Sequence, residues 1–89
     1  MKSRTSRRFR DRLEALPEHV KRQAREAYRL FQQDPTHPGL RFKQVCSVPP
    51  TYSARIGIGY RALGVLGGDT IVWFWIGSHA EYDHLLEQI

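Results

Sequence analysis

Apolar residues recur at helical spacing near the start of the chain. Phe9, Leu13 and Leu16 lie three or four residues apart, so they share one side of a helix. Ser6 or Thr5 precedes this stripe, and either hydroxyl can cap a helix by accepting a backbone hydrogen bond. We therefore predict a first helix that begins next to these residues. The polar and basic residues before it fit either a frayed tail or a short strand.

Pro17 separates this helix from a second one, because proline breaks a helix interior but suits the first position of a new helix. Asp34 ends the second helix, because the residue before a proline avoids the helical conformation. The apolar face of this second helix consists of Val20, Ala24, Ala27, Tyr28 and Phe31.

From residue 40 onward the apolar residues form short runs that glycine and proline separate. We predict strands at Leu40–Cys46, Tyr52–Ile56, Tyr60–Leu66 and Thr70–Ile76. Strict alternation in the first of these places Arg41, Lys43 and Val45 on one face, and Leu40, Phe42, Gln44 and Cys46 on the other.

Glycines mark two turns between these strands. Gly57 and Gly59 flank Ile58 and permit a tight reversal with positive φ. A second hairpin signal, Gly67-Gly68-Asp69, stands between two apolar runs. The last three strands should therefore be antiparallel neighbours.

The last predicted strand is apolar on both faces. Simple alternation puts three apolar side chains on each face. One face has Val72, Phe74 and Ile76, and the other has Ile71, Trp73 and Trp75. A strand of this kind suits the centre of a sheet that is covered on both sides.

A short helix should follow, from His79 to about Gln88, because Ser78 and Glu81 stand in the S-x-x-E arrangement of a capping box. Helices followed by strands predict an α+β fold. Its two N-terminal helices pack on one face of a twisted antiparallel sheet of about four strands. The other face is left open for function.

The charge of the chain narrows the class of partner. The chain of 89 residues has a formal net charge of +5 and a pI of about 9.9, which favours nucleic acid, an acidic protein segment or an anionic surface. Simple solubility is the alternative reading. No apolar run approaches the ~20 residues of a membrane helix, and the basic start lacks the apolar stretch of a secretory signal. The single cysteine, Cys46, excludes an internal disulfide and fits a reducing, cytoplasmic compartment.

Four cations lie on predicted strands: Arg41, Lys43, Arg55 and Arg61. Each alone is most simply part of a solvated face, but together they offer a phosphate-binding surface. A three-residue loop at Gly67-Gly68-Asp69 would place Arg61 opposite Trp75, and a cation beside an indole can hold phosphate and stack a base. A two-residue loop would instead place Arg61 opposite Ile76.

His79 stands at the start of the last helix, where an imidazole can act as acid or base. Tyr82 follows at i+3 and shares its side of the helix. An inert surface histidine is the alternative. A metal site of His79 and Asp83 is rejected, because no third ligand is suitably spaced. The sequence also lacks paired carboxylates and nucleotide-binding glycine motifs.

Several segments resemble one known family. Arg-Phe-Lys at 41–43, Tyr-Ser-Ala-Arg-Ile at 52–56, Gly-Tyr-Arg-Ala-Leu at 59–63 and Trp-Phe-Trp-Ile-Gly-Ser-His-Ala-Glu-Tyr at 73–82 are similar to segments of the RelE/ParE superfamily of bacterial type II toxins. The resemblance covers nearly the whole chain and implies a single toxin domain over residues 1–89. It also implies an acidic antitoxin that neutralises the toxin.

The resemblance leaves the mode of action open between two branches. RelE-like members cut messenger RNA in the ribosomal A site, where the RNA's own 2′-hydroxyl attacks the adjacent phosphate without a metal or cofactor. ParE-like members poison DNA gyrase and cut nothing. A third alternative is a non-toxic interaction domain of the same fold. We favour the first, an mRNA interferase that arrests growth by endoribonuclease activity.

The resemblance also implies roles for particular residues. Arg61 matches an arginine that binds the scissile phosphate. His79 falls where relatives place an arginine or histidine that acts as acid to the 5′-leaving oxygen, and Tyr82 matches a tyrosine that orients or stacks. Further phosphate contacts would come from Arg41, Lys43 and Arg55. The run at 79–82 is less basic than in the founding RelE type, and no carboxylate base is evident.

Overall fold

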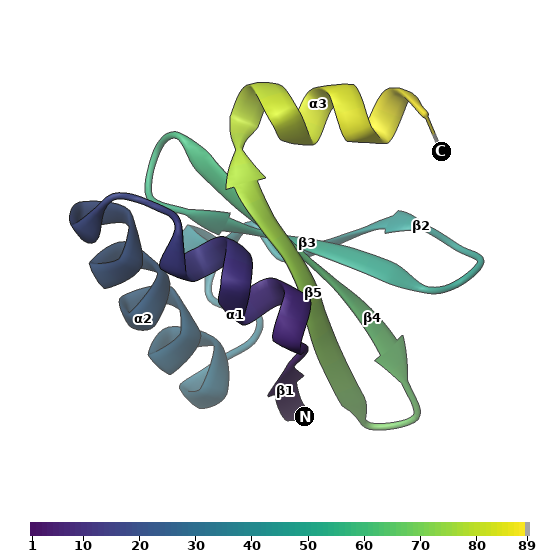
Figure 1. Cartoon of the computed structure of the whole chain (residues 1–89). Helices are drawn as coiled ribbons and strands as arrows, with labels where there is room; N and C mark the ends of the chain where they lie inside the picture. Colours follow the sequence, from purple (N-terminus) through teal and green to yellow (C-terminus); the bar gives the residue numbers. More distant parts are fainter. Residues whose placement is uncertain (89) are drawn as a thin grey trace.

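The computed structural model describes residues 1–88, which form one five-stranded sheet and three α-helices (Figure 1). The strand order is β1-β5-β4-β3-β2. In chain order the elements are β1 (Lys2–Thr5), α1 (Arg7–Glu14), α2 (Glu18–Gln33), the 3₁₀ turn η1 (Pro38–Leu40), β2 (Lys43–Cys46), β3 (Thr51–Ile56), β4 (Tyr60–Gly67), β5 (Thr70–Ser78) and α3 (His79–Glu87). The predicted α+β class and order of elements are confirmed, with one strand more than expected.

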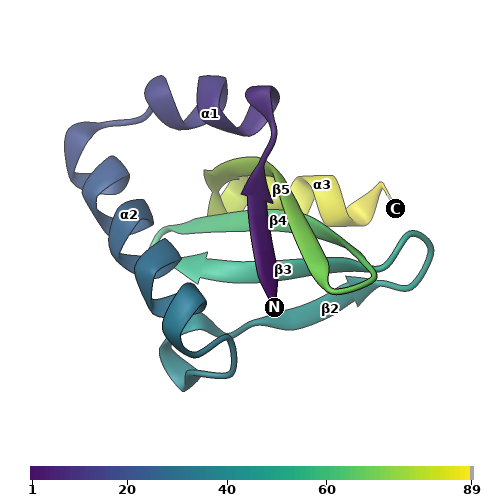
Figure 2. The same cartoon turned by 90° about the horizontal axis from the view of Figure 1, so that it is seen from below.

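The additional strand is β1, so the first residues form a short strand rather than a frayed tail. It runs parallel to β5, from the pair Lys2 and Thr70 to the pair Thr5 and Trp73 (Figure 2). The backbone N–H of Ser6 then donates to the Trp73 carbonyl at 2.9 Å. The sheet is therefore mixed rather than purely antiparallel, and β5 lies inside it with neighbours on both edges.

Helices α1 and α2 cover one face of the sheet, as predicted. Ser6 caps α1 by accepting from the Phe9 N–H at 3.1 Å. Pro17 occupies the cap position of α2 rather than its first turn, so this helix begins at Glu18. Phe31 fills the space beneath α2, with its ring centroid 5.3 Å from that of Trp73. Full burial of such a side chain contributes about 1.5–3 kcal/mol. This layer is the main core because most of the buried apolar side chains belong to it.

The segment before β2 differs from the predicted strand. Leu40 belongs to the turn η1, and Arg41 adopts the left-handed conformation with φ 45°, so the strand starts only at Lys43. The predicted division of side chains nevertheless holds. Leu40 and Phe42 pack in the main core, whereas Val45 packs on the opposite face.

A β-bulge in β5 overturns the simple alternation predicted for this strand. The hairpin between β4 and β5 has a two-residue turn, because Gly67 pairs with Thr70. Gly64 then pairs with Trp73 but Leu63 pairs with Trp75, which leaves one extra residue on β5.

The extra residue is Phe74, and it changes the faces of everything that follows it. Ile71, Trp73 and Ile76 lie in the main core, whereas Phe74 and Trp75 both pack on the other face. The prediction that Trp75 shares a face with Trp73, and Phe74 with Ile76, was therefore wrong.

The second face is only partly open, because α3 packs across it. Tyr82 of α3 forms a small second core with Leu63 and Trp75, and Leu85 and Leu86 pack against it. The expectation of a wholly uncovered face is thus corrected, and what remains open is a groove beside α3. Among the described residues, none of the helices has the length and apolar character needed to cross a membrane.

Candidate functional site

A groove of about 290 Å³ lies between α3 and the sheet, and we call it the basic groove. It brings together residues from the segment before β2, from β2, β3, β4 and from α3. Its lining consists of Arg41, Lys43, Ser53, Arg61, His79, Tyr82, Asp83 and Leu86. Most of the residues predicted for the site therefore meet in one place, although they span half of the sequence.

Strand register places two of the cations on the same face. Lys43 pairs with Ser53, and Ser53 pairs with Leu63, two residues beyond Arg61. Because side chains two residues apart on a strand share a face, Lys43 and Arg61 both project toward α3. Arg41 reaches the same groove from its left-handed position before β2. Within residues 1–88, none of these three cations forms a salt bridge, so their charge is available to an anion.

His79 occupies the first position of α3, and its place is set by backbone contacts. The predicted capping box is present: Ser78 Oγ accepts from the Glu81 N–H at 3.1 Å, and Glu81 Oε1 accepts from the Ser78 N–H at 2.9 Å. The His79 N–H donates to the Gly59 carbonyl at 2.8 Å. The imidazole stays about half exposed, at 49% of its side-chain surface, and its Nε2 lies 3.4 Å from Asp83 Oδ1.

Tyr82 presents an unusual hydroxyl to this region. The residue is only 5% exposed, and within residues 1–88 its Oη has no hydrogen-bond partner. A buried polar group without a partner costs about 1–3 kcal/mol, so such groups are rare in folded proteins. The Tyr82 ring also meets the His79 ring edge to face, with centroids 6.0 Å apart.

Two of the predicted site residues do not line the groove. Trp75 is 8% exposed and belongs to the second core rather than to the groove. Arg55 pairs with Arg61 across the strands, but its Nε donates to the Gly57 carbonyl at 2.9 Å, at the β3–β4 turn. Because of the bulge, Arg61 lies opposite Gly77, so neither predicted register for Arg61 was right.

Sequence reasoning missed the cation that does contact Trp75. The Arg12 guanidinium lies over the indole, 5.0 Å from the ring centroid. Its Nη2 is 3.5 Å from Glu81 Oε2. Hydrogen bonds from Ser78, helped by Arg12, lower the pKa of Glu81 below its ordinary value. No periodic pattern links Arg12 to Trp75, because the two residues are far apart in sequence.

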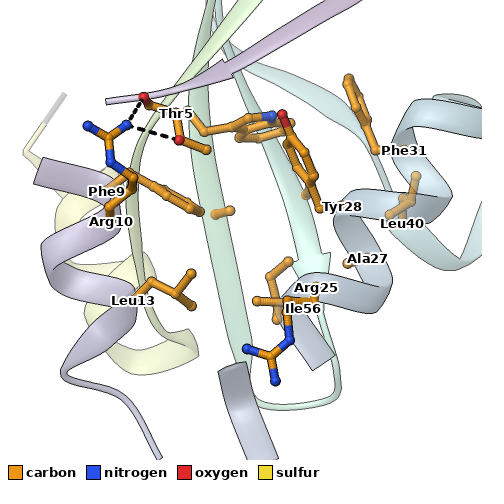
Figure 3. A pocket seen from close by; sticks show the side chains of 14 residues that line it. Thr5, Phe9, Arg10, Leu13, Arg25, Ala27, Tyr28, Phe31, Leu40 and Ile56 are labelled. Atoms are coloured by element: carbon orange, nitrogen blue, oxygen red, sulfur yellow. Dashed lines mark hydrogen bonds between the residues drawn. The ribbon is translucent and has the colours of Figure 1, made fainter. Parts of the chain in front are cut away.

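A second hollow, the apolar cavity, lies on the opposite face of the sheet between α1 and α2 (Figure 3). Its volume is about 310 Å³, and most of its walls are aliphatic and aromatic side chains such as Phe9, Leu13 and Ile56. Arg10 and Arg25 also line it and are exposed to solvent. Arg10 is held by hydrogen bonds to Thr5, whereas Arg25 makes no ion pair among the described residues.

Comparisons with known proteins agree with this architecture. Residues 18–84 match the family model of the ParE-like toxin domain, so the chain belongs to this family and to the RelE/ParE superfamily of toxins. The fold is similar to the crystal structure of a copper-bound mutant toxin from Helicobacter pylori. That likeness has a TM-score of 0.59 and 16% identity, over 91% of this chain and 97% of the other. No curated protein matches the sequence.

Proposed function

We propose that this toxin is an mRNA endonuclease that acts at the ribosome. The observation that carries the proposal is the basic groove, where Arg41, Lys43 and Arg61 surround one hollow with an imidazole at its edge. Three cations without salt-bridge partners in the described chain suit a phosphodiester better than an uncharged substrate. The proposed reaction requires RNA rather than DNA, because only RNA carries the 2′-hydroxyl that acts as the nucleophile.

The cations supply the electrostatic part of the reaction. As the 2′-oxygen bonds to phosphorus, negative charge grows on the non-bridging oxygens of the phosphate. Arg61, on a rigid central strand, and Lys43 beside it stabilise that charge more strongly than the charge of the ground state. Arg41 extends the positive surface toward the next phosphate of the chain.

One of the two proton transfers involves α3. The bond from phosphorus to the 5′-oxygen breaks as the 2′-oxygen bond forms, and His79 donates a proton to the leaving 5′-oxygen. Asp83 Oδ1 lies 3.4 Å from Nε2 of the ring and can orient the imidazole, and Nδ1 is the proton donor in this scheme. The 2′-hydroxyl proton passes to solvent, and the products are a 2′,3′-cyclic phosphate and a 5′-hydroxyl. The nucleophile belongs to the RNA, so this scheme requires no metal or cofactor.

The second candidate function is inhibition of DNA gyrase without cleavage. The match to the ParE-like family model favours it, because ParE-like toxins poison gyrase. In that case the basic groove would bind polyanion without chemistry, and His79 would be dispensable.

The experiment that tests the proposal is inducible expression followed by mapping of messenger RNA 5′ ends. We expect new ends within coding sequences for the wild type. Arg61→Ala should lower cleavage about 10²–10³-fold through lost charge stabilisation, and His79→Ala about 10²–10⁴-fold through lost acid catalysis.

Matched controls come from the same elements or the same residue type. His84→Ala replaces an exposed histidine of α3 that does not line the groove, and Arg29→Ala replaces an exposed arginine of α2. Both should cleave like the wild type. Full toxicity of both Arg61→Ala and His79→Ala would contradict RNA cleavage, and loss of gyrase supercoiling would then identify the second function.

The proposed partner is an acidic antitoxin, and the apolar cavity offers it a binding site. An amphipathic segment would insert apolar side chains between α1 and α2, with its carboxylates near Arg10 and Arg25 (Figure 3). Complementary charge of this kind favours fast and specific association.

A further inference from the structure

Arg12 makes three contacts that join α1 to the start of α3. Its Nε donates to the Ile76 carbonyl at 2.8 Å, its Nη2 lies 3.5 Å from the Glu81 carboxylate, and its guanidinium covers the Trp75 ring. These contacts link residues about 64 positions apart in the chain. No other arginine of α1 reaches across to α3 within the described residues.

Because β1 is short, a side chain rather than a neighbouring strand donates a hydrogen bond to the end of β5. Strand β1 ends at Thr5, opposite Trp73, so within residues 1–88 the rest of β5 has no strand neighbour on that edge. The Ile76 carbonyl lies on this unpaired part and accepts its hydrogen bond from Arg12 instead. A guanidinium is suited to the place because it is planar, donates in several directions and stacks on an aromatic ring.

The same cluster fixes the first turn of α3. Glu81 Oε1 accepts from the Ser78 N–H, while Oε2 faces Arg12, so one carboxylate serves both the capping box and the tether to α1. Trp75 packs against Tyr82 and is also held close to the backbone of β5. A Cβ atom on Gly77 would come within 2.6 Å of the indole. His79 and Tyr82 both lie in this turn.

We propose that Arg12 is a positioning residue of the basic groove, acting through Glu81 and Trp75 to set the orientation of His79 and Tyr82. The inference rests on the proposed RNA cleavage, in which His79 faces the substrate and the buried Tyr82 ring lies against the His79 ring. Arg12 itself does not line the groove and contacts no reacting group.

The test compares Arg12→Lys with Arg8→Lys in RNA cleavage and in amide hydrogen exchange. Lysine keeps the charge but cannot make the three contacts at once, so we expect kcat to fall about 10- to 100-fold, the scale expected for a small misplacement. KM should stay within about threefold, because Arg41, Lys43 and Arg61 still bind the phosphates. The Glu81 and Tyr82 amides should exchange at least about tenfold faster, because the first turn opens more readily.

Arg8 is an exposed neighbour on α1, and Arg8→Lys should match the wild type in every measurement. Identical exchange rates and kcat for the two variants would overturn the proposal. So would a fall in thermal stability of Arg12→Lys with unchanged exchange at α3, since that result would show a general structural role. If the wild type does not cut RNA, the proposed function fails, but the exchange comparison still tests whether Arg12 holds α3.

Discussion

At the scale of single residues, the candidate site contains side chains whose burial cannot be predicted from the residues next to them in sequence. Tyr82 lies one turn after His79, and its hydroxyl is buried without a partner within residues 1–88. Folding alone does not explain such a group, because a phenylalanine would pack in the same space without the cost of desolvation.

Tyr82→Phe should therefore separate stability from activity. We expect the free energy of unfolding to stay equal or rise by up to about 1 kcal/mol, because an unpaired buried hydroxyl is removed. RNA cleavage should fall at the same time if the hydroxyl serves the groove, because the resemblance gives Tyr82 an orienting role and its ring contacts that of His79. Urea unfolding and the cleavage assay measure the two effects.

Tyr28→Phe is the matched control, since the Tyr28 hydroxyl donates to the Ser3 carbonyl at 3.4 Å. It should lose up to about 1 kcal/mol of stability and keep its activity. A loss of stability in Tyr82→Phe equal to that in Tyr28→Phe would mean that the Tyr82 hydroxyl has a partner when the protein is folded.

At the scale of elements, the junction between β5 and α3 builds the site. The bulge at Phe74 turns Trp75 toward α3, and the capping box then begins the helix that carries His79. The Glu81 carboxylate is charged in this arrangement over a wider pH range than usual. Its pKa is lowered first by the backbone hydrogen bond from Ser78, then by the Ser78 side chain and by Arg12.

This pKa shift predicts how stability depends on pH. A carboxyl whose pKa is lower in the folded state stabilises the protein above the unfolded value, about 4.5, and loses that contribution as the pH falls through the folded value. Wild type should therefore have a higher Tm than Glu81→Gln at neutral pH, with a difference that shrinks below about pH 4.5. Thermal unfolding followed by circular dichroism between pH 3 and 7 measures it.

Glu26→Gln, on the exposed face of α2, controls for the loss of one negative charge from a basic protein. If the Tm difference for Glu81→Gln stays constant across the pH range, the ionised capping box does not stabilise α3.

At the scale of the whole molecule, one sheet separates two surfaces of different chemistry. Ser53 and Arg61 face the basic groove, whereas their neighbours Ala54 and Ala62 face the apolar cavity. Because neighbouring residues on a strand point to opposite faces, β3 and β4 contribute to both surfaces. The proposed substrate and the proposed antitoxin would then bind on opposite sides.

Arg25→Glu tests this separation. It reverses a charge at the apolar cavity and should weaken binding of the cognate acidic antitoxin about 10- to 100-fold, through like-charge repulsion. RNA cleavage by the free toxin should change little. Titration calorimetry and the cleavage assay report the two effects.

Arg4→Glu changes the net charge equally but lies on β1, on the face away from the cavity, since its neighbours Ser3 and Thr5 point inward. Equal loss of antitoxin affinity in both variants would mean that the antitoxin responds to net charge rather than to this cavity.

The sequence by itself determined most of the elements and the family of this protein. Local signals are responsible, because helix periodicity, the caps at Ser6 and Ser78 and the turn glycines act over three or four residues. The strand cations were predicted as one set of four. Three of them, Arg41, Lys43 and Arg61, line the basic groove, whereas Arg55 does not, and Arg41 precedes β2 rather than belonging to it.

Only the tertiary structure decided which face each aromatic residue occupies and what holds the site together. One extra residue in β5 reverses the face of Trp75, and a bulge depends on the partner strand rather than on the local sequence. The parallel pairing of β1 and the reach of Arg12 to Glu81 join distant segments, so no local pattern encodes them. The chain thus specified the chemical groups of the groove, and packing between distant elements specified their arrangement.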